Sequence, residues 1–192
     1  MITYRRTDLS EKRRVAEIDR SEHVIQDYIF KNRELVLLDV EWHIPRWSTE
    51  GSGPHSVDGK LNKWEMYFRD DCVLWGAFDG ETLVGFSAYR PGLTEDMGQL
   101  TLLHVSKEYR RLGIGRRLAE NVVQWARQQG DRRLYVSATQ SRPTVDFYTG
   151  LGFTPTDQPV PELFEMEPED IHMVMDLTAP NHPLQRTDAA EL

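Results

Sequence analysis

The chain has 192 residues, of which 39% are hydrophobic, 10% aromatic and 28% charged, and its formal net charge at pH 7 is -8. These values describe an ordinary globular chain that is long enough for one domain with a buried core and too apolar for intrinsic disorder. The acidic balance argues against a nucleic-acid partner, because affinity for polyanions comes from lysine and arginine. It favours a cationic substrate, although an acidic surface can also serve solubility alone.

The single cysteine, Cys72, allows no internal disulfide, and the six histidines are scattered at spacings that do not suit a zinc site. The N-terminal residues include basic side chains but no apolar segment behind them, and the longest aliphatic run, 35–38, is far too short to span a bilayer. We therefore expect a cytoplasmic protein without a metal cofactor, a membrane partner or a nucleic-acid partner.

The first half of the chain changes from β to helical patterns and contains one loop rich in glycine and serine. Apolar spacing and capping residues predict, in order, a strand at 2–7, a helix from Asp8 or Ser10 to Arg20, a hairpin from Val24 to His43, an exposed loop at 48–55 and a helix at about 61–68. The loop is not expected to be a domain boundary, because the segment before it is too small to form a core alone.

The second half is richer in strand patterns. Asp79-Gly80 between two apolar runs is a strong hairpin signal, because the turn needs positive φ. The patterns predict strands at 72–78, 82–89 and 98–105, a helix at 113–129 stopped by Gly130, a strand at 134–138, a short helix at 143–149 stopped by Gly150 and a strand at 171–177. Strands and helices that alternate in this way indicate a mixed α/β sheet, and the tail at 180–192 offers little to bury.

A turn with two glycines and several arginines connects the strand at 98–105 to the long helix. The first turn of a helix has unpaired N–H donors and the positive end of the helix dipole, and glycine lets the backbone approach a phosphate. Arg110, Arg111 and Arg116 add positive charge. The turn is neither a P-loop nor a dinucleotide fingerprint, because Leu118 occupies the place of the third glycine and no Lys-Ser or Lys-Thr follows. It predicts an anion site, with a basic surface turn as the alternative.

Segment 110–115, Arg-Arg-Leu-Gly-Ile-Gly, resembles the Arg/Gln-x-x-Gly-x-Gly/Ala signature of the GCN5-related N-acetyltransferases (GNAT). Segment 144–153 is similar to the Ala-x-x-Phe-Tyr-x-x-x-Gly-Phe segment of the same family. The resemblance covers about 71–177 and implies an α/β (α+β) fold, with a mixed, mostly antiparallel sheet flanked by helices and splayed between its fourth and fifth strands. It implies one domain at 1–178, with variable acceptor-side elements at 1–70, a cofactor-binding core at 71–178 and a tail at 179–192.

The resemblance also implies that acetyl-CoA binds as a co-substrate. Main-chain amides of 111–116 would hold the pyrophosphate, and the strand segment 103–105 would pair with the pantetheine arm. The implied cofactor residues are Leu103, His104, Val105, Arg110, Arg111, Leu112, Gly113, Ile114, Gly115, Arg116, Ser141 and Phe147. The chain departs from many members by having Ser141 and Thr144 in place of Asn and Ala. Ser141 is placed either to bond the cofactor arm or to cap the following helix.

Acetyl transfer to an amine needs a proton donor for the departing thiolate and a base for the amine. By resemblance, Tyr148 is the general acid. Some members have a catalytic glutamate at the strand position that is Gln99 here, and an amide cannot accept the proton, so the base stays open. His104 is a candidate because its pKa range suits a base, although a lone strand histidine is more often structural.

Candidate residues for the acceptor come from the strand and from the end of the first helix. Gln99 and Thr101 share a strand face and are expected to line the site or relay a proton through water. Asp19 and Glu22, together with Glu17, could bind or deprotonate a cationic substrate. The alternative for each acidic residue is ordinary solvated helix charge.

The leading hypothesis is an acetyl-CoA-dependent N-acetyltransferase that acts on a primary amine of a small cationic metabolite or antibiotic. One alternative is an acetyltransferase for a protein N-terminus or lysine. A second, suggested by the missing glutamate, is a non-catalytic CoA-binding regulatory module. A second copy of the chain is a candidate partner, and Trp42 and Trp47 are candidates for a wall of the acceptor pocket.

Overall fold

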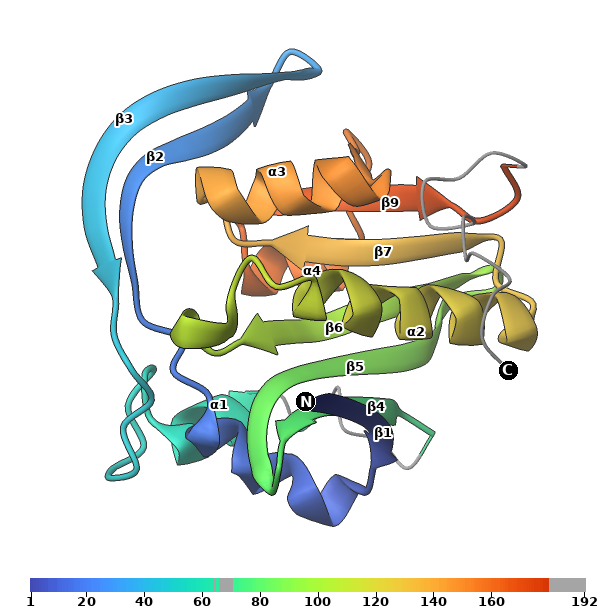
Figure 1. Ribbon diagram of the computed structural model, residues 1–192. Coiled ribbons are helices and arrows are strands. Elements are labelled where there is room, and N and C mark those ends of the chain that lie inside the picture. Colours follow the sequence, from blue (N-terminus) through green and yellow to red (C-terminus); the bar gives the residue numbers. More distant parts are fainter. Residues whose placement is uncertain (64, 66–70, 180–192) are drawn as a thin grey trace.

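A computed structural model describes residues 1–63, 65 and 71–179 of the chain. Its centre is a seven-stranded sheet in the order β1-β4-β5-β6-β7-β9-β8 (Figure 1). The strands are β1 (Ile2–Thr7), β4 (Val73–Asp79), β5 (Thr82–Thr94), β6 (Met97–Val105), β7 (Arg133–Ala138), β8 (Thr154–Pro155) and β9 (Ile171–Asp176). Neighbouring strands are antiparallel except β6 and β7, which are parallel. The predicted mixed, mostly antiparallel sheet is therefore confirmed.

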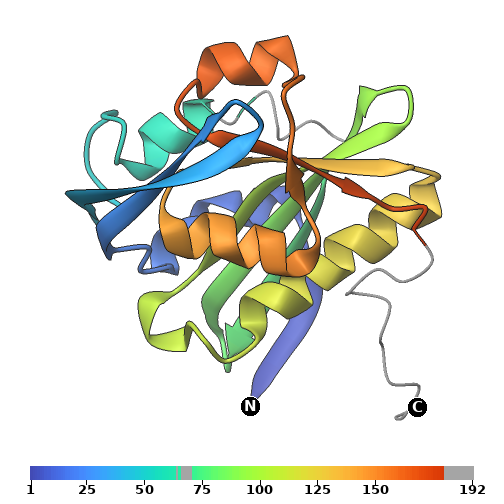
Figure 2. The same cartoon turned by 90° about the horizontal axis from the view of Figure 1, so that it is seen from above.

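Helices cover both faces of this sheet, and each face has its own apolar core (Figure 2). One face is covered by α2 (Ile114–Gln129) and α3 (Arg142–Leu151), and the other by the 3-10 helix η1 (Leu9–Glu17), α1 (Val57–Lys63) and α4 (Pro161–Met166). The apolar residues of α2 recur at helical spacing, so Leu118, Val122 and Ala126 are fully buried on one side of the helix. Val15 and Leu163 bury η1 and α4 against the opposite face.

Strands β6 and β7 diverge soon after they meet. They pair only where Met97–Gln99 of β6 lies beside Arg133–Tyr135 of β7. Beyond this short register, β6 keeps its partner β5 as far as Val105, while its other edge has no strand beside it in the described part of the chain. The splay between the fourth and fifth strands of the core is therefore present, and it opens a wedge in the middle of the sheet.

A two-stranded arm, formed by β2 and β3 (residues 22–44), flanks the open end of the wedge (Figure 1). Its turn residues Asn32 and Arg33 have φ of 52 and 66, as a tight hairpin turn requires. The arm is tied to the region around α3, because the Tyr28 amide donates to the Gln140 carbonyl at 2.8 Å and the Tyr28 hydroxyl donates to Asp146 at 3.0 Å. The predicted hairpin is confirmed as β2 (Glu22–Lys31) and β3 (Glu34–Ile44).

Several boundaries differ from those predicted. The first helix is a 3-10 helix that ends at Glu17, before Arg20. Helix α3 continues past Gly150 and is capped by Gly152, whose φ of 99 places it in the left-handed region. Strand β8 and helix α4 were not predicted, because each is too short to show a period. The helix expected at about 61–68 begins earlier, at Val57, and α1 ends at Lys63; beyond it only Glu65 of the expected helix is described, and the tail at 180–192 lies outside the described residues.

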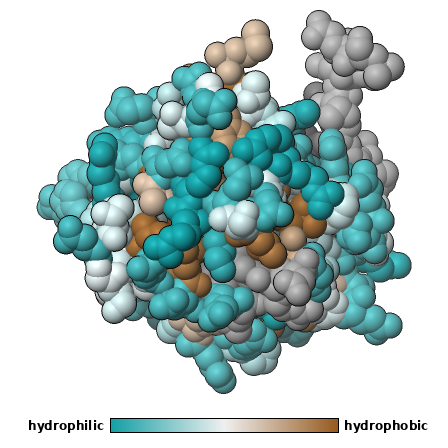
Figure 3. All heavy atoms as spheres, turned by 90° about the horizontal axis from the view of Figure 1, so that it is seen from below, coloured by the Kyte–Doolittle hydropathy of each residue, from teal (hydrophilic) through white to brown (hydrophobic). Residues whose placement is uncertain are grey.

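The face that contains η1 and α1 is largely hydrophilic, and its apolar side chains form only small, separated patches (Figure 3). No helix in the described part of the chain is both long and apolar enough to cross a membrane.

Candidate active site

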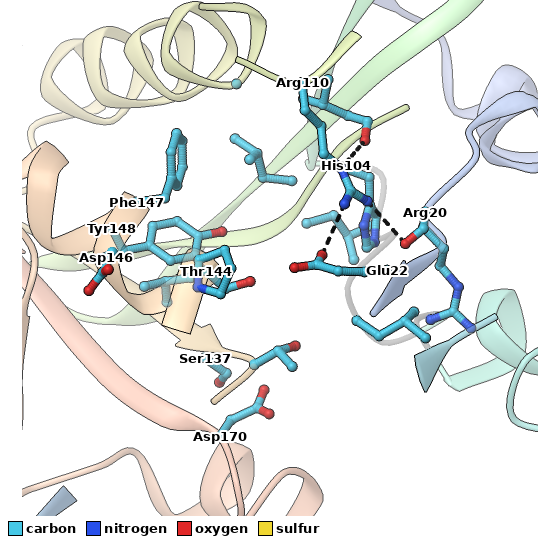
Figure 4. Close-up of a pocket in the computed structure, with 18 of the residues that line it drawn as sticks. Arg20, Glu22, His104, Arg110, Ser137, Thr144, Asp146, Phe147, Tyr148 and Asp170 are labelled. Atoms are coloured by element: carbon cyan, nitrogen blue, oxygen red, sulfur yellow. Dashed lines mark hydrogen bonds and ion pairs between the residues drawn. The ribbon is translucent and has the colours of Figure 1, made fainter. Parts of the chain in front are cut away.

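A cavity of about 870 Å³ lies where β6 and β7 diverge. Its walls come from β6, the turn before α2, the start of α3, the beginning of the arm, α1 and the turn before β9. Figure 4 shows side chains from these elements converging from segments far apart in the sequence. Most of the residues expected from the resemblance lie in this one cavity.

The glycine-arginine turn forms one end of the cavity. Arg111 has φ of 66 and Gly113 has φ of 81, so the backbone takes left-handed conformations at two positions just before α2. A Cβ on Gly113 would have no atom within 4 Å, so open space lies above the turn. The first amide that donates inside α2 is that of Arg117, so the amides before it are available to a ligand. This open N-terminal cradle suits the phosphates of a nucleotide such as CoA.

The open edge of β6 leads from this turn into the wedge. Leu103, His104 and Val105 all line the cavity, and Phe147 of α3 lies close to Gly115. Of the implied cofactor residues, nine line the cavity: Leu103, His104, Val105, Arg110, Arg111, Gly113, Gly115, Arg116 and Phe147. Leu112 is 66% exposed, Ile114 is buried in the core, and neither lines the cavity.

Ser141 is fully buried and does not line the cavity. It occupies the N-cap position of α3, yet its hydroxyl donates to the Thr144 hydroxyl at 2.9 Å and makes no capping bond to the helix backbone. Thr144 lines the cavity in its place.

Arg110 holds the arm against the turn. Its guanidinium donates to the Glu22 carboxylate at 3.1 Å, to the Arg20 carbonyl at 3.0 Å and to the Val105 carbonyl at 3.3 Å (Figure 4). Glu22 therefore lies in the cavity as expected, but it is already paired with a cation. This pair links the acceptor-side elements to the strand that ends at the cofactor turn.

Tyr148 of α3 lies deep in the wedge. Its side chain is only 6% exposed and packs edge-on against Phe147 and Phe153. The hydroxyl lines the cavity and forms no hydrogen bond with any residue that the structure describes. Burial, together with the charge of Asp170, raises the pKa of Tyr148, so the hydroxyl keeps its proton at neutral pH.

His104 also faces this cavity, where its ring packs edge-on against Trp47 at 5.7 Å between centroids. Burial and the nearby charges of Arg20, Lys60 and Arg110 lower its pKa to about 3. The imidazole is therefore neutral at pH 7 and binds a proton weakly, which does not favour the role of base that the sequence left open.

The structure separates the four residues expected to bind the acceptor. Thr101 and Glu22 line the cavity, whereas Asp19 and Gln99 do not. The Asp19 carboxylate pairs with Arg46, and Gln99 is 2% exposed in the paired part of β6. Among the described residues, the Gln99 side-chain oxygen has no hydrogen-bond partner.

Several groups that the sequence did not indicate lie in the part of the cavity where an acceptor would bind, which we call the acceptor end. They are Arg20, Lys60, Ser137, Glu167 and Asp170. The Arg20 guanidinium stacks over Trp47, 3.9 Å from the ring centroid, and burial lowers the pKa of both Arg20 and Lys60. No local motif marks any of these residues, because they come from the η1–β2 connection, α1, β7 and the α4–β9 turn and meet only in the folded chain.

The fold and the cavity together have the features of the GNAT class: a splayed sheet with an open glycine turn before the helix that follows the open strand. The chain belongs to this family, since the model described as "Acetyltransferase (GNAT) family" matches residues 37–153. The predicted family is therefore confirmed.

Two curated relatives come from Rattus norvegicus. N-acetyltransferase 8B is 35% identical over 95 residues, which is 47% of this chain and 43% of the rat protein. N-acetyltransferase 8F1 is 33% identical over 99 residues, which is 49% of this chain and 45% of the rat protein. The matched segment thus spans less than half the length of each relative.

Solved structures agree in fold. Nourseothricin acetyltransferase superposes with a TM-score of 0.68 at 18% identity, covering 92% of this chain and 98% of that chain. A putative streptothricin acetyltransferase from Bacillus anthracis in complex with acetyl coenzyme A gives the same values. The ribosomal-protein-S18-alanine N-acetyltransferase from Escherichia coli has a TM-score of 0.59 at 13% identity, with both chains fully covered. At these identities the likeness establishes the fold alone.

Proposed function

We propose that the protein is an acetyl-CoA-dependent N-acetyltransferase that transfers the acetyl group directly to a primary amine of a small molecule. The observation behind the proposal is the placement of Tyr148 in the same cavity as the open turn at Gly113, with a hydroxyl that has no hydrogen-bond partner among the described residues. One end of the cavity suits phosphates, and the other holds a protonated acid.

In this proposal the main chain binds the co-substrate. Amides at the start of α2 bind the pyrophosphate, because they have no carbonyl partner within the helix. The free edge of β6 from Leu103 to Val105 pairs with the pantetheine arm as an added strand would. The thioester then lies in the wedge near Tyr148, which donates its proton to the departing sulfur.

The acceptor enters from the side formed by the arm and α1. That end of the cavity has carboxylates from Glu22 and Asp170 and cations from Arg20 and Lys60. A small acceptor that contains an ammonium fits Asp170, because Glu22 is paired with Arg110, and an anionic group on the same molecule fits Arg20. The amine panel for testing therefore includes an alkyl diamine and an α-amino acid beside a simple alkylamine.

The test compares the unaltered protein with Tyr148→Phe in release of CoA thiol. Without the acid, kcat should fall by about 10²- to 10⁴-fold. The thermal shift that acetyl-CoA produces should be retained, because the removed hydroxyl contacts neither the turn nor the β6 edge. Tyr89→Phe is a matched control, since this buried tyrosine lies outside the cavity lining and its hydroxyl donates to Asp131.

Each other outcome identifies a different function. CoA binding without turnover of any amine, in the unaltered protein, would indicate the non-catalytic module. Acetylation of peptides but not of small amines would indicate the protein acetyltransferase. Absence of any thermal shift with acetyl-CoA would contradict all three hypotheses.

A further inference from the structure

A pair of acidic residues, Glu167 and Asp170, lies in the turn between α4 and β9 and lines the cavity. In Figure 4, Asp170 lies on the side of the cavity that also holds Ser137 and Tyr148. The turn is firmly held. The Glu167 carbonyl accepts from the Asp170 amide at 3.2 Å and lies 3.1 Å from His172 Nε2. His172 Nδ1 lies 2.7 Å from the Tyr135 hydroxyl, which fixes the turn to β7. Asp170 is therefore presented to the cavity by a rigid support.

The other acidic groups in the cavity lining are already engaged. Glu22 pairs with Arg110, and Asp146 accepts from the Tyr28 hydroxyl and from Arg142. Glu167 pairs with Lys63 at 3.1 Å. For Asp170, no ion pair is found among the residues that the structure describes. Asp170 is thus the cavity carboxylate that has no cation paired with it, and its close neighbour is the Glu167 carboxyl group.

A second, independent feature points to a ligand at the same place. The Tyr148 side chain is 6% exposed, and its hydroxyl has no hydrogen-bond partner in the described chain, although it borders the cavity. The hydroxyl oxygen itself is open to the cavity, so a group on a bound molecule can form a hydrogen bond with it. Asp170 lines the same cavity, and its charge contributes to the raised pKa of Tyr148.

The surroundings of Asp170 suit proton transfer near neutral pH. Burial and the neighbouring Glu167 carboxylate raise the pKa of Asp170 to about 7, while Lys63 and Lys60 act in the opposite direction. A base works best when its pKa is near the operating pH. By contrast, His104, with a pKa lowered to about 3, would not retain a proton taken from the amine.

We propose that Asp170 is the catalytic base: its carboxylate binds the ammonium group of the acceptor and removes one proton from it. This inference rests on the proposed acetyl transfer and identifies its missing base. An alkylammonium with a pKa of about 10.4 is neutral at pH 7 in roughly one molecule in a few thousand, so the step provides the reactive amine.

The proton and electron changes balance. Asp170 takes one proton from R–NH3⁺, and the nitrogen lone pair of R–NH2 forms the C–N bond to the acetyl carbon. The C–S bond breaks with its electron pair going to sulfur, and Tyr148 gives sulfur its proton. The remaining excess proton on nitrogen restores the Tyr148 hydroxyl, so the products are the acetamide, the CoA thiol and protonated Asp170, which releases its proton to solvent.

The two residues are coupled. The negative charge of Asp170 helps to keep the proton on Tyr148. When Asp170 accepts the ammonium proton this charge disappears, so Tyr148 becomes a stronger acid at the stage when the thiolate departs. Proton uptake by Asp170 therefore has two effects: it makes the amine nucleophilic, and it makes Tyr148 a stronger proton donor.

The test measures kcat/KM against pH for a simple alkylamine with the full chain, its Asp170→Asn variant and a control, Glu169→Gln. Glu169 lies in the same turn but is exposed and outside the cavity lining, so its removal changes the net charge equally. At pH 7, Asp170→Asn should lose at least about 10²-fold in kcat/KM, and the control less than about twofold. Acetyl-CoA should still produce its thermal shift in all three proteins.

Two further readouts separate a base from a merely structural residue. In the unaltered protein, activity should fall as pH decreases through about 7, and Glu167→Gln should move this limb to lower pH, because a neighbouring negative charge is removed. In Asp170→Asn, activity should keep rising towards the pKa of the amine, at about 10.4. A weakly basic, fluorinated alkylamine should restore much of the lost rate to Asp170→Asn, but not to Tyr148→Phe.

Normal activity of Asp170→Asn with an unchanged pH profile would overturn the assignment of the base while leaving the acetyltransferase proposal intact. An equal loss with basic and weakly basic amines would also overturn it, because a structural defect does not depend on the amine. If the unaltered protein binds acetyl-CoA but acetylates no amine, the proposed function fails and this inference fails with it.

Discussion

The two ends of the cavity are built in different ways. The proposed cofactor end consists of one continuous segment, 110–116, and the groups proposed to bind the ligand there are mainly backbone amides. The acceptor end is assembled from side chains on separate elements: Arg20, Lys60, His104, Tyr148 and Asp170. A site made of backbone needs only the glycines that permit its conformation, whereas a site made of side chains depends on how distant elements pack.

The two ends also differ in electrostatics. The turn adds arginines to the positive end of α2, although the whole chain has a net charge of -8. The acceptor end mixes both signs: burial and three cations lower the pKa of His104, while burial and a neighbouring carboxylate raise that of Asp170. The first end suits a fixed polyanionic ligand, and the second can move a proton.

The largest effect is expected from Gly113→Asp. A Cβ at this position would meet open space, so the fold should persist, although the φ of 81 is strained for any residue other than glycine. The new carboxylate would project into the anion cradle, where it would repel the pyrophosphate and strain the left-handed backbone. The Kd for acetyl-CoA, measured by calorimetry, should rise by about 100-fold, or about 2.7 kcal/mol.

Gly113→Asn separates charge from shape, because Asn has the same size and tolerates the left-handed conformation. We expect it to bind acetyl-CoA several-fold more tightly than Gly113→Asp. Unchanged affinity in both variants would mean that the phosphates bind elsewhere.

Arg110→Met should affect the acceptor end more than the cofactor end. The guanidinium donates to Glu22 and to the Arg20 carbonyl, so its loss should loosen the arm while the methionine keeps most of the apolar stem. The KM for the amine should rise about tenfold, while the Kd for CoA should change less than about threefold. Arg117→Met, on the exposed side of α2, is the control. A loss confined to CoA affinity would assign Arg110 to the cofactor end instead.

The fold was largely predictable because its long elements show strong periods. The Asp79-Gly80 turn, the apolar stripe of α2 and the glycine after it fixed a hairpin and a helix at nearly the observed bounds. The short elements β8 and α4 were not predicted. The predicted end of α3 lies two residues too early, because Gly150 rather than Gly152 was interpreted as the end of the helix. Short elements are determined by tertiary contacts rather than by local pattern.

The site divides in the same way. The cofactor turn was visible as a motif, because backbone geometry at Gly113 requires a particular residue type. Asp170 could not be identified, since its chemical environment depends on α1, α3 and α4 packing around it. Asp19 was a reasonable candidate from its charge, but the fold turns it towards Arg46. Spacing along a chain does not report which carboxylate remains unpaired after folding.

Asp170→Asn should also raise the free energy of unfolding at neutral pH, because it removes a carboxylate whose burial lowers stability. In the folded chain its pKa is raised from 3.8 to about 7, so the folded state binds more protons than the unfolded state between these values. The stability of the unaltered protein should therefore decrease as pH rises from about 4 to 7. The variant should be more stable by about 1 kcal/mol at pH 7.5, with the difference vanishing below about pH 4. Denaturant melts across this range measure it, and a variant that is less stable at pH 7.5 would contradict the expected burial cost.

The smallest effect is expected at Glu11, which lies outside both ends of the cavity and provides a baseline for stability without function. Its carboxylate accepts two bonds of 2.9 Å from Arg5, a bond from Arg14 and one from the Asp8 amide in a capping box. The bonds from Arg5, the Asp8 amide and Arg14 lower the pKa of Glu11 to about 2, although desolvation opposes the shift. The stability that the Glu11 carboxylate contributes is therefore present above about pH 4.5 and is lost as pH falls through about 2. Glu11→Gln should therefore cost about 0.5–1 kcal/mol at pH 7, less at pH 3, and leave kcat/KM unchanged. A change in kcat/KM would show that η1 positions the acceptor side, and η1 would then belong to the functional site rather than to the supporting fold alone.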